Sequence, residues 1–332
     1  LQSRFEEAER WSELAEAKIE RLGGDESIAA DYADTRAAVL IQAGRHREAI
    51  EVQERALELH SRINGPESLD AARAMTTMGH ALSSIGDYKG AVDSYTRSLS
   101  LKETLVGTDH PTVGFTAASL SQAYAGLNEY DEAVELARRA LAILDRVFGK
   151  DDPQLAIPLN NLAYGLEGLG RYDEARAMHE RSIEIVSRSW GPEHPQIAIS
   201  LLNLSSLEKR AGDFQAALTA SRRAGEILTA TYGTDHPIYA YAANNIGVFL
   251  METGQAAQGV IHLEKALDIR VSTDSDPLLT AVTRFNLGRA QWEAGQRSLG
   301  RRNVVQAERE LVDLGEAGQE DLAAARAWLT EH

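Results

Sequence analysis

The sequence predicts an all-α fold, a solenoid of stacked antiparallel helix pairs, and three observations support this prediction. Glycine, replaced once by asparagine, recurs at a spacing of 42 residues. Apolar residues recur every three to four positions on both sides of each such glycine, which is the period of an amphipathic helix. Alanine, leucine and glutamate dominate while β-branched runs are short, and this composition favours helix over strand. A repeated helix pair builds a solenoid because one pair cannot bury its apolar face alone.

Seven repeats share one register. The punctuating column contains Gly44, Gly86, Asn128, Gly170, Gly212 and Gly254, with Gly295 one residue early. The same spacing aligns an alanine column (Ala49, Ala91, Ala133, Ala175, Ala217) and a basic column (Arg55, Arg97, Arg139, Arg181, Arg223, Lys265). Agreement across several columns is much stronger evidence for a repeat architecture than any single short motif.

The elements follow in order along the chain. A helix at about residues 3–22 has the phase of a second helix, so residues 1–24 are expected to form half a repeat. Residues 25–315 then form seven repeats, and residues 316–332 hold a capping helix that covers the last apolar face with Leu322, Ala325 and Leu329. Since the first residue is Leu1 and the pattern begins midway, we interpret the sequence as a piece of a longer protein.

Within each repeat, small residues and turn residues set the helix boundaries. Glycine ends the first helix because it adopts positive φ without strain. Alanine in the next column lets the two helices approach closely. Between repeats, glycine stops the second helix and proline starts the next, as in Gly191 to Pro195 and Gly233 to Pro237. We assign the basic column to ion pairs between repeats.

Composition limits the classes of partner. The net charge of −16, with no compensating basic stretch, argues against nucleic acid and anionic membranes as partners. The absence of cysteine excludes disulfides and thiolate metal sites. No apolar run approaches the roughly 20 residues of a membrane span, and no signal-peptide pattern opens the chain. We therefore expect a cytoplasmic protein without cofactor or metal.

These columns resemble the tetratricopeptide repeat (TPR) in its 42-residue form, which is found in kinesin light chains. The resemblance is closest at Asn161-Leu162-Ala163, from Gly170 to Ala175 and from Gly191 to Pro195. It implies a right-handed superhelix of helix pairs and a concave groove that binds a protein or an extended peptide. The departures are Asn128 in place of glycine, Gly259 and Gly300 in place of alanine, and Pro66 without a preceding histidine. They predict looser packing in the first and last repeats.

Two edges of the sequence resemble the C-terminal repeat regions of myxobacterial-type serine/threonine protein kinases. These are the segments Ala17 to Asp25 and Arg284 to Trp292, together with Ala327-Trp328-Leu329. The resemblance implies that a kinase domain lies upstream and that this part is its recruiting or regulatory arm in signalling. The sequence itself contains no kinase catalytic motif, so we expect this part not to be an enzyme.

In the family, the column nine residues before each glycine faces the groove. That column contains Thr35, Thr77, Ser119, Asn161, Asn203, Asn245 and Asn286. A side-chain amide both donates and accepts hydrogen bonds, so such a row suits the backbone of an extended peptide. The predicted peptide-binding residues are therefore Asn160, Asn161, Tyr164, Asn203, Lys209, Arg210, Tyr241, Asn244, Asn245, Asn286 and Arg289.

Each of these assignments has an alternative. The asparagines can instead bond to a neighbouring helix, and Tyr164 and Tyr241 can serve in packing rather than as anchors. Lys209 and Arg210 suit an acidic ligand residue or simply face water. His110, His194 and His236 lie in different turns, too far apart to share a metal ion, so they indicate helix starts. We expect a monomer; the alternative function is self-association or intramolecular docking through the solenoid ends.

Overall fold

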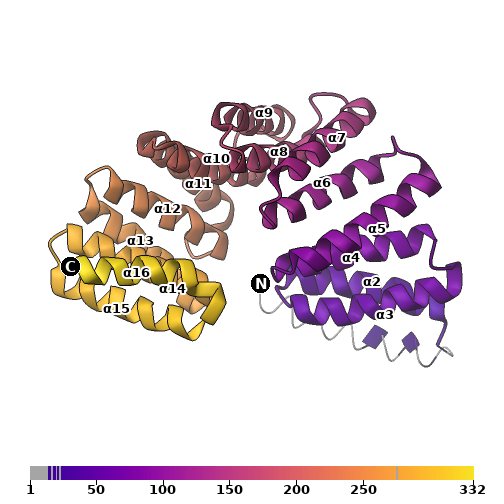
Figure 1. Cartoon of the computed structure of the whole chain (residues 1–332), viewed down its shortest axis with the longest axis horizontal. Helices are drawn as coiled ribbons and strands as arrows, with labels where there is room; N and C mark the ends of the chain where they lie inside the picture. Colours follow the sequence, from indigo (N-terminus) through magenta and orange to yellow (C-terminus); the bar gives the residue numbers. More distant parts are fainter. Residues whose placement is uncertain (1–13, 16–17, 20, 22–23, 274–275) are drawn as a thin grey trace. The chain divides into compact units, whose positions relative to one another are not determined.

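The computed structural model describes residues 14–15, 18–19, 21, 24–273 and 276–332, and most of these residues are helical. Fifteen α-helices and no strands occur within those ranges. The helix expected at about residues 3–22 falls mostly outside them. The all-α prediction is therefore confirmed, and Figure 1 shows consecutive helices running back and forth beside one another.

The helices alternate between two roles in each repeat. The first helices are α2 (Glu26–Gln42), α4 (Leu69–Ser84), α6 (Pro111–Gly126), α8 (Ala156–Gly168), α10 (Pro195–Ala211), α12 (Pro237–Glu252) and α14 (Pro277–Glu293). The second helices are α3 (His46–Asn64), α5 (Tyr88–Val106), α7 (Tyr130–Phe148), α9 (Tyr172–Trp190), α11 (Phe214–Tyr232), α13 (Ala256–Ser272) and α15 (Arg297–Asp313). Short 3₁₀ turns, η1 (Pro153–Leu155) and η2 (Gly315–Gly318), precede α8 and the last helix, α16 (Gln319–Glu331).

The chain forms two compact units, Leu1–Met178 and His179–His332, called here the N-terminal and the C-terminal unit. The core of the N-terminal unit includes Tyr95, Leu120 and Ile143, contributed by α5, α6 and α7. The core of the C-terminal unit includes Phe249 and Leu263, contributed by α12 and α13. In both units the core lies between helices that neighbour one another in the sequence, as expected when each repeat contacts only its neighbours.

Histidine and proline together start three of the first helices. His110, His194 and His236 occupy the N-cap positions of α6, α10 and α12, and proline follows each. The Nδ1 atom of each ring accepts a hydrogen bond from the backbone N–H two residues further on, at 3.2–3.3 Å. The histidine therefore satisfies one of the free N–H groups of the helix, and proline lacks another. The predicted role of these histidines at helix starts is confirmed.

The punctuating column adopts left-handed backbone conformations throughout. Its glycines have φ between 73° and 86°. Asn128, the exception in residue type, follows the same geometry with φ of 61°, and the phenol of Tyr130 donates to its Oδ1 at 2.6 Å. Asparagine is the residue after glycine that best tolerates this conformation, so the substitution preserves the turn.

Close packing in the last repeats contradicts the expectation from the alanine column. A Cβ atom on Gly259 of α13 would lie 2.6 Å from the carbonyl oxygen of Gly247 of α12. A Cβ atom on Gly300 of α15 would lie 2.5 Å from the carbonyl oxygen of Gly288 of α14. In the last repeats the prediction of looser packing was wrong, because each glycine faces a second glycine and the two backbones approach more closely than alanine would permit.

The basic column forms an ion pair between repeats at Arg139, which pairs with Glu103 of the preceding second helix. There the assignment is confirmed. Arg223 and Lys265 instead pair with Glu193 and Asp235, acidic residues of the turns that lead into the first helices of their own repeats, each at 2.5 Å. At Arg97 the assignment was wrong, because that side chain approaches Asp93 of its own helix at 3.8 Å.

The last helix, α16, packs against α14 and α15. Its Ala325 is fully buried in a cluster with Phe285 of α14 and Leu311 of α15, and Leu322 and Leu329 pack against the same cluster. The division of the chain into half a repeat, seven repeats and a capping helix stays a prediction.

Candidate functional site

The row of polar residues nine positions before each glycine is accessible in both units. In the N-terminal unit Thr35 is exposed, and Asn161 is partly exposed. In the C-terminal unit Asn203 is exposed, and Asn245 and Asn286 are partly exposed. We call this row the amide row.

Three asparagines of the amide row donate hydrogen bonds toward the preceding first helix. Asn161 Nδ2 of α8 donates to the backbone oxygen of Ala118 of α6, at 2.9 Å. In the C-terminal unit, Asn245 Nδ2 of α12 donates to Ser205 Oγ of α10, at 3.3 Å. One role of these amides is therefore to link successive first helices. Because a side-chain amide has two N–H donors and an oxygen with two lone pairs, one such bond leaves capacity for a ligand.

The C-terminal unit extends these bonds into a network. Asn286 Nδ2 of α14 donates to Asn244 Oδ1 of α12 at 3.3 Å, and Asn244 Nδ2 donates to Asn245 Oδ1 at 3.4 Å. The single hydroxyl proton of Thr283 of α14 has two acceptors within reach, the backbone oxygen of Leu279 at 2.9 Å and Asn244 Oδ1 at 3.3 Å. Asn244 therefore sits at the centre of a polar cluster that joins α12 and α14.

A second row of exposed side chains flanks the amide row, four residues closer to the start of each helix. It contains Phe115 and Ile157 in the N-terminal unit, which are 38% and 60% exposed, and Ile199 and Tyr241 in the C-terminal unit, 38% and 46% exposed. Residues four apart lie on one face of a helix. We call this the apolar row. Of its members only Tyr241 was identified from the sequence. The other three could have been found from their spacing, because each precedes a residue of the amide row by four positions.

The remaining predicted residues lie in different environments. Tyr164 is 44% exposed on α8, whereas its neighbour Asn160 is only 7% exposed. Lys209 and Arg210 are exposed at the end of α10. Arg289 of α14 pairs with Glu252 of α12 at 3.1 Å. Asn160 therefore offers little surface to a ligand, while the other members are accessible at least in part.

Three buried basic residues share one repeat position, sixteen residues after the punctuating glycine, and the sequence analysis missed all three. They are His60, Lys102 and Arg270. His60 Nε2 lies 2.9 Å from Asp34 Oδ2. Lys102 Nζ instead donates to two hydroxyl oxygens, Thr76 Oγ1 at 2.6 Å and Thr116 Oγ1 at 2.8 Å. Burial lowers the pKa of Lys102 to about 8, because water no longer stabilises the ammonium.

Arg270 occupies this position in the C-terminal unit. Its side chain is contributed by α13, and its guanidinium donates to the backbone oxygen of Leu279 and, at 2.6 Å, to Thr283 Oγ1 of α14. The guanidinium carbon lies 5.2 Å from the ring centre of Tyr241 of α12. Burial lowers the pKa of Arg270. The side chain of Arg270 therefore extends from the second helix α13 to contact α12 and α14, two first helices that carry amide-row residues.

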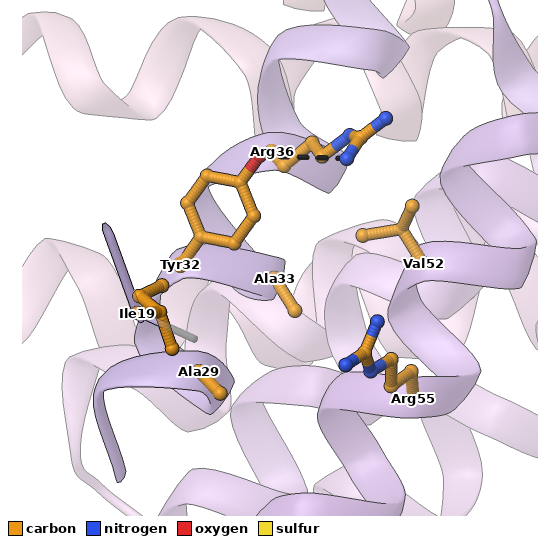
Figure 2. Close-up of a pocket in the computed structure, with 7 residues that line it drawn as sticks. All are labelled: Ile19, Ala29, Tyr32, Ala33, Arg36, Val52 and Arg55. Carbon is orange, nitrogen blue, oxygen red and sulfur yellow. Dashed lines mark hydrogen bonds between the residues drawn. The ribbon is translucent and has the colours of Figure 1, made fainter. Parts of the chain in front are cut away.

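A pocket at the start of the N-terminal unit is lined by apolar side chains, one tyrosine and two arginines. Ile19, Ala29, Tyr32, Ala33, Arg36, Val52 and Arg55 line it (Figure 2). Arg36 donates to the phenol oxygen of Tyr32 at 3.4 Å. Its polar side-chain groups are the Tyr32 phenol and the guanidinium groups of Arg36 and Arg55, and no carboxylate or histidine is among these lining residues.

Two searches of the described ranges returned nothing. Residues 24–273 and 276–332, with the few described before them, hold no group of three metal-ligating side chains. None of the helices in those ranges has the length and the apolar character needed to cross a membrane.

Solved structures with a similar fold cover most of the chain. BtubC (BKLC) from P. vanneervenii is 22% identical, with a TM-score of 0.59 over 69% of this chain and 92% of its own. A Rap protein complexed with Competence and Sporulation Factor is 12% identical, with a TM-score of 0.59 over 91% and 98%. The apo form of the quorum sensor NprR from B. thuringiensis is 14% identical, with a TM-score of 0.56 over 99% and 94%. At these identities the likeness shows a shared fold.

Sequence comparison gives the family. Among curated proteins, no sequence match was found. The model of the tetratricopeptide repeat matches residues 27–104, 116–185 and 154–230, which together make up more than half of the chain. The matched ranges include Asn161 and Asn203 of the amide row and Ile157 and Ile199 of the apolar row. The chain belongs to the tetratricopeptide repeat family.

Proposed function

We propose that the first-helix face binds an extended segment of a partner protein or peptide. The observation that carries this proposal is the juxtaposition of the amide row and the apolar row on the same helices. An extended peptide presents backbone N–H and C=O groups along its length, and its side chains alternate between two sides. Amides suit the backbone, and exposed apolar side chains suit one row of ligand side chains.

Descriptions of the structural neighbours support the same class of function. One neighbour, a Rap protein, was solved in complex with Competence and Sporulation Factor, and another, NprR, is described as a quorum sensor. Both are scaffolds of stacked helices like this chain. The proposal for this chain is limited to a binding function without catalysis, carried by the chain as a monomer.

The test is a pull-down from a lysate of the source cells with the chain as bait. The double variant Asn203→Ala, Asn245→Ala should lose a partner that the wild type retains, because two amides of the C-terminal unit are removed. A matched control, Gln215→Ala with Gln258→Ala, removes two exposed amides from the second helices α11 and α13. A partner that is lost equally from both variants, or from neither, contradicts the proposal.

A second, more specific proposal concerns a larger protein to which these repeats would belong. We propose that the chain is the cytoplasmic recruiting or regulatory arm of a signalling kinase, on the resemblance of its edge segments to kinase repeat regions. The reading frame upstream of residue 1 tests this proposal directly. A kinase catalytic domain in that frame supports it, and a frame without one contradicts it.

A further inference from the structure

Arg270 is a buried positive charge whose hydrogen-bond acceptors in the described part of the chain are uncharged. It is 4% exposed, and its two hydrogen-bond acceptors are a backbone carbonyl and a hydroxyl, both neutral. No carboxylate of the described residues forms an ion pair with it. Asp276 favours the charge electrostatically, but its own carboxylate is exposed and accepts from the backbone N–H of Leu278, at 2.8 Å.

The comparison with Lys102 shows why this burial is unusual. Lys102 occupies the same repeat position in the N-terminal unit, and it can release its proton near pH 8. A buried lysine therefore avoids much of the cost of a buried charge by becoming neutral. Arginine keeps its proton at any pH at which a protein is folded. Arg270 must remain charged, and a buried charge is costly unless an opposite charge compensates it.

The surroundings of Arg270 connect it to the face that carries the two rows. The hydroxyl oxygen of its partner Thr283 lies 3.3 Å from Asn244 Oδ1, the atom that also accepts a hydrogen bond from Asn286 of the amide row. Its aromatic partner Tyr241 belongs to the apolar row and is 46% exposed. The positive charge thus lies directly beneath an exposed ring and beside a chain of amides, in an environment where water screens it poorly.

We infer that the C-terminal unit selects ligand segments with a carboxylate side chain, which lies over Tyr241 and Asn244 and is attracted by the charge of Arg270. This inference rests on the proposed peptide-binding function and specifies the ligand class of the same face. Tyr241 and the amides contact the ligand, whereas Arg270 acts from below as a specificity-determining residue. A carboxylate there supplies the compensating charge that the described residues do not.

The competing explanation is structural. The bonds of Arg270 to Leu279 and Thr283 and its stacking on Tyr241 hold α13 against α12 and α14. Under that explanation, removal of the guanidinium lowers stability and leaves ligand preference unchanged. The net charge of −16 makes the distinction sharp, because long-range electrostatics alone disfavours acidic ligands.

The experiment uses a positional-scanning library of hexapeptides, acetylated at the N-terminus and amidated at the C-terminus, bound to the full chain in 0.15 M and in 1 M salt. We expect Asp or Glu to be favoured over Asn or Gln at one ligand position by about tenfold, as for the attraction of opposite charges that are close but not in contact near a protein surface. The preference should persist in 1 M salt, because a buried charge is screened less than exposed ones such as Lys209. This measurement requires no variant.

Two variants complete the test. Arg270→Met should reduce the acid preference to about twofold or less, whereas Lys102→Met, which removes the buried cation of the N-terminal unit, should leave it unchanged. Thermal unfolding verifies that both variants fold. Peptides that bind without acid preference, or an acid preference that survives Arg270→Met or vanishes in 1 M salt, overturn this inference alone. Failure of every hexapeptide to bind overturns the proposed function together with it.

Discussion

Replacement of Gly300 by alanine should destabilise the C-terminal unit, although alanine is the better helix former. The added Cβ would lie 2.5 Å from the carbonyl oxygen of Gly288 and 2.8 Å from the backbone nitrogen of Trp292. Both are backbone atoms of α14, so the two helices must separate to relieve the contact. Overpacking of this kind costs about 1–3 kcal/mol, and the gain in helix propensity offsets about 1 kcal/mol. We expect a net loss of up to about 2 kcal/mol in the free energy of unfolding.

The matched control is Gly225→Ala in α11. A Cβ there would lie 3.3 Å from Ile246 Cδ1, the end of a flexible side chain, and further from everything else. The propensity gain should therefore dominate and stabilise the chain by up to about 1 kcal/mol. Urea unfolding followed by circular dichroism gives both midpoints. If Gly300→Ala raises the midpoint as much as Gly225→Ala does, the close backbone approach does not exist.

Three further substitutions test other parts of the structure. Lys102 has a lowered pKa in the folded chain, so the folded state binds fewer protons than the unfolded state between pH 8 and 10.5. The free energy of unfolding of the wild type minus that of Lys102→Met, both from urea titrations, should rise over that interval by at most about 3 kcal/mol. A difference that stays constant with pH refutes the lowered pKa. His236→Ala removes the N-cap acceptor of α12 and should cost about 1 kcal/mol in thermal unfolding, which His236→Asn should restore. Asn128→Ala places alanine at φ of 61° and should cost about 1–2 kcal/mol, whereas Asn128→Gly should be tolerated; equal melting temperatures for the two would refute the assigned strain.

Features set by local geometry could be predicted from the sequence. The punctuating glycines mark positive φ because that requirement belongs to a single residue. The His-Pro turns mark helix starts because an N-cap involves residues only two or three positions apart. The repeat spacing then orders these local elements into helix pairs, so the fold class follows without knowledge of any long-range contact.

Features set by facing pairs of residues could not be predicted from one column. Gly259 indicated loose packing only while its partner was unknown; Gly247, which faces it across the helix pair, reverses the interpretation. The role of Arg270 likewise depends on residues that face it from other helices. In four repeats its position holds an apolar residue (Leu144, Val186, Leu228, Leu311), and nothing in the sequence reveals that the side chain at this position reaches between two first helices.

The amide row shows how a structural role and a binding role can coincide. Asn245 and Asn286 already link successive first helices, and such bonds fix the orientation of each side chain before a ligand arrives. An amide held in place loses little conformational entropy on binding, which improves affinity through preorganisation. The hydrogen bonds between helices therefore do not argue against a ligand. We expect the amides that these bonds hold, Asn245 and Asn286, to contribute more to the affinity for a ligand than Asn203, which is exposed. Single alanine variants would then lose more affinity at Asn245 and Asn286 than at Asn203.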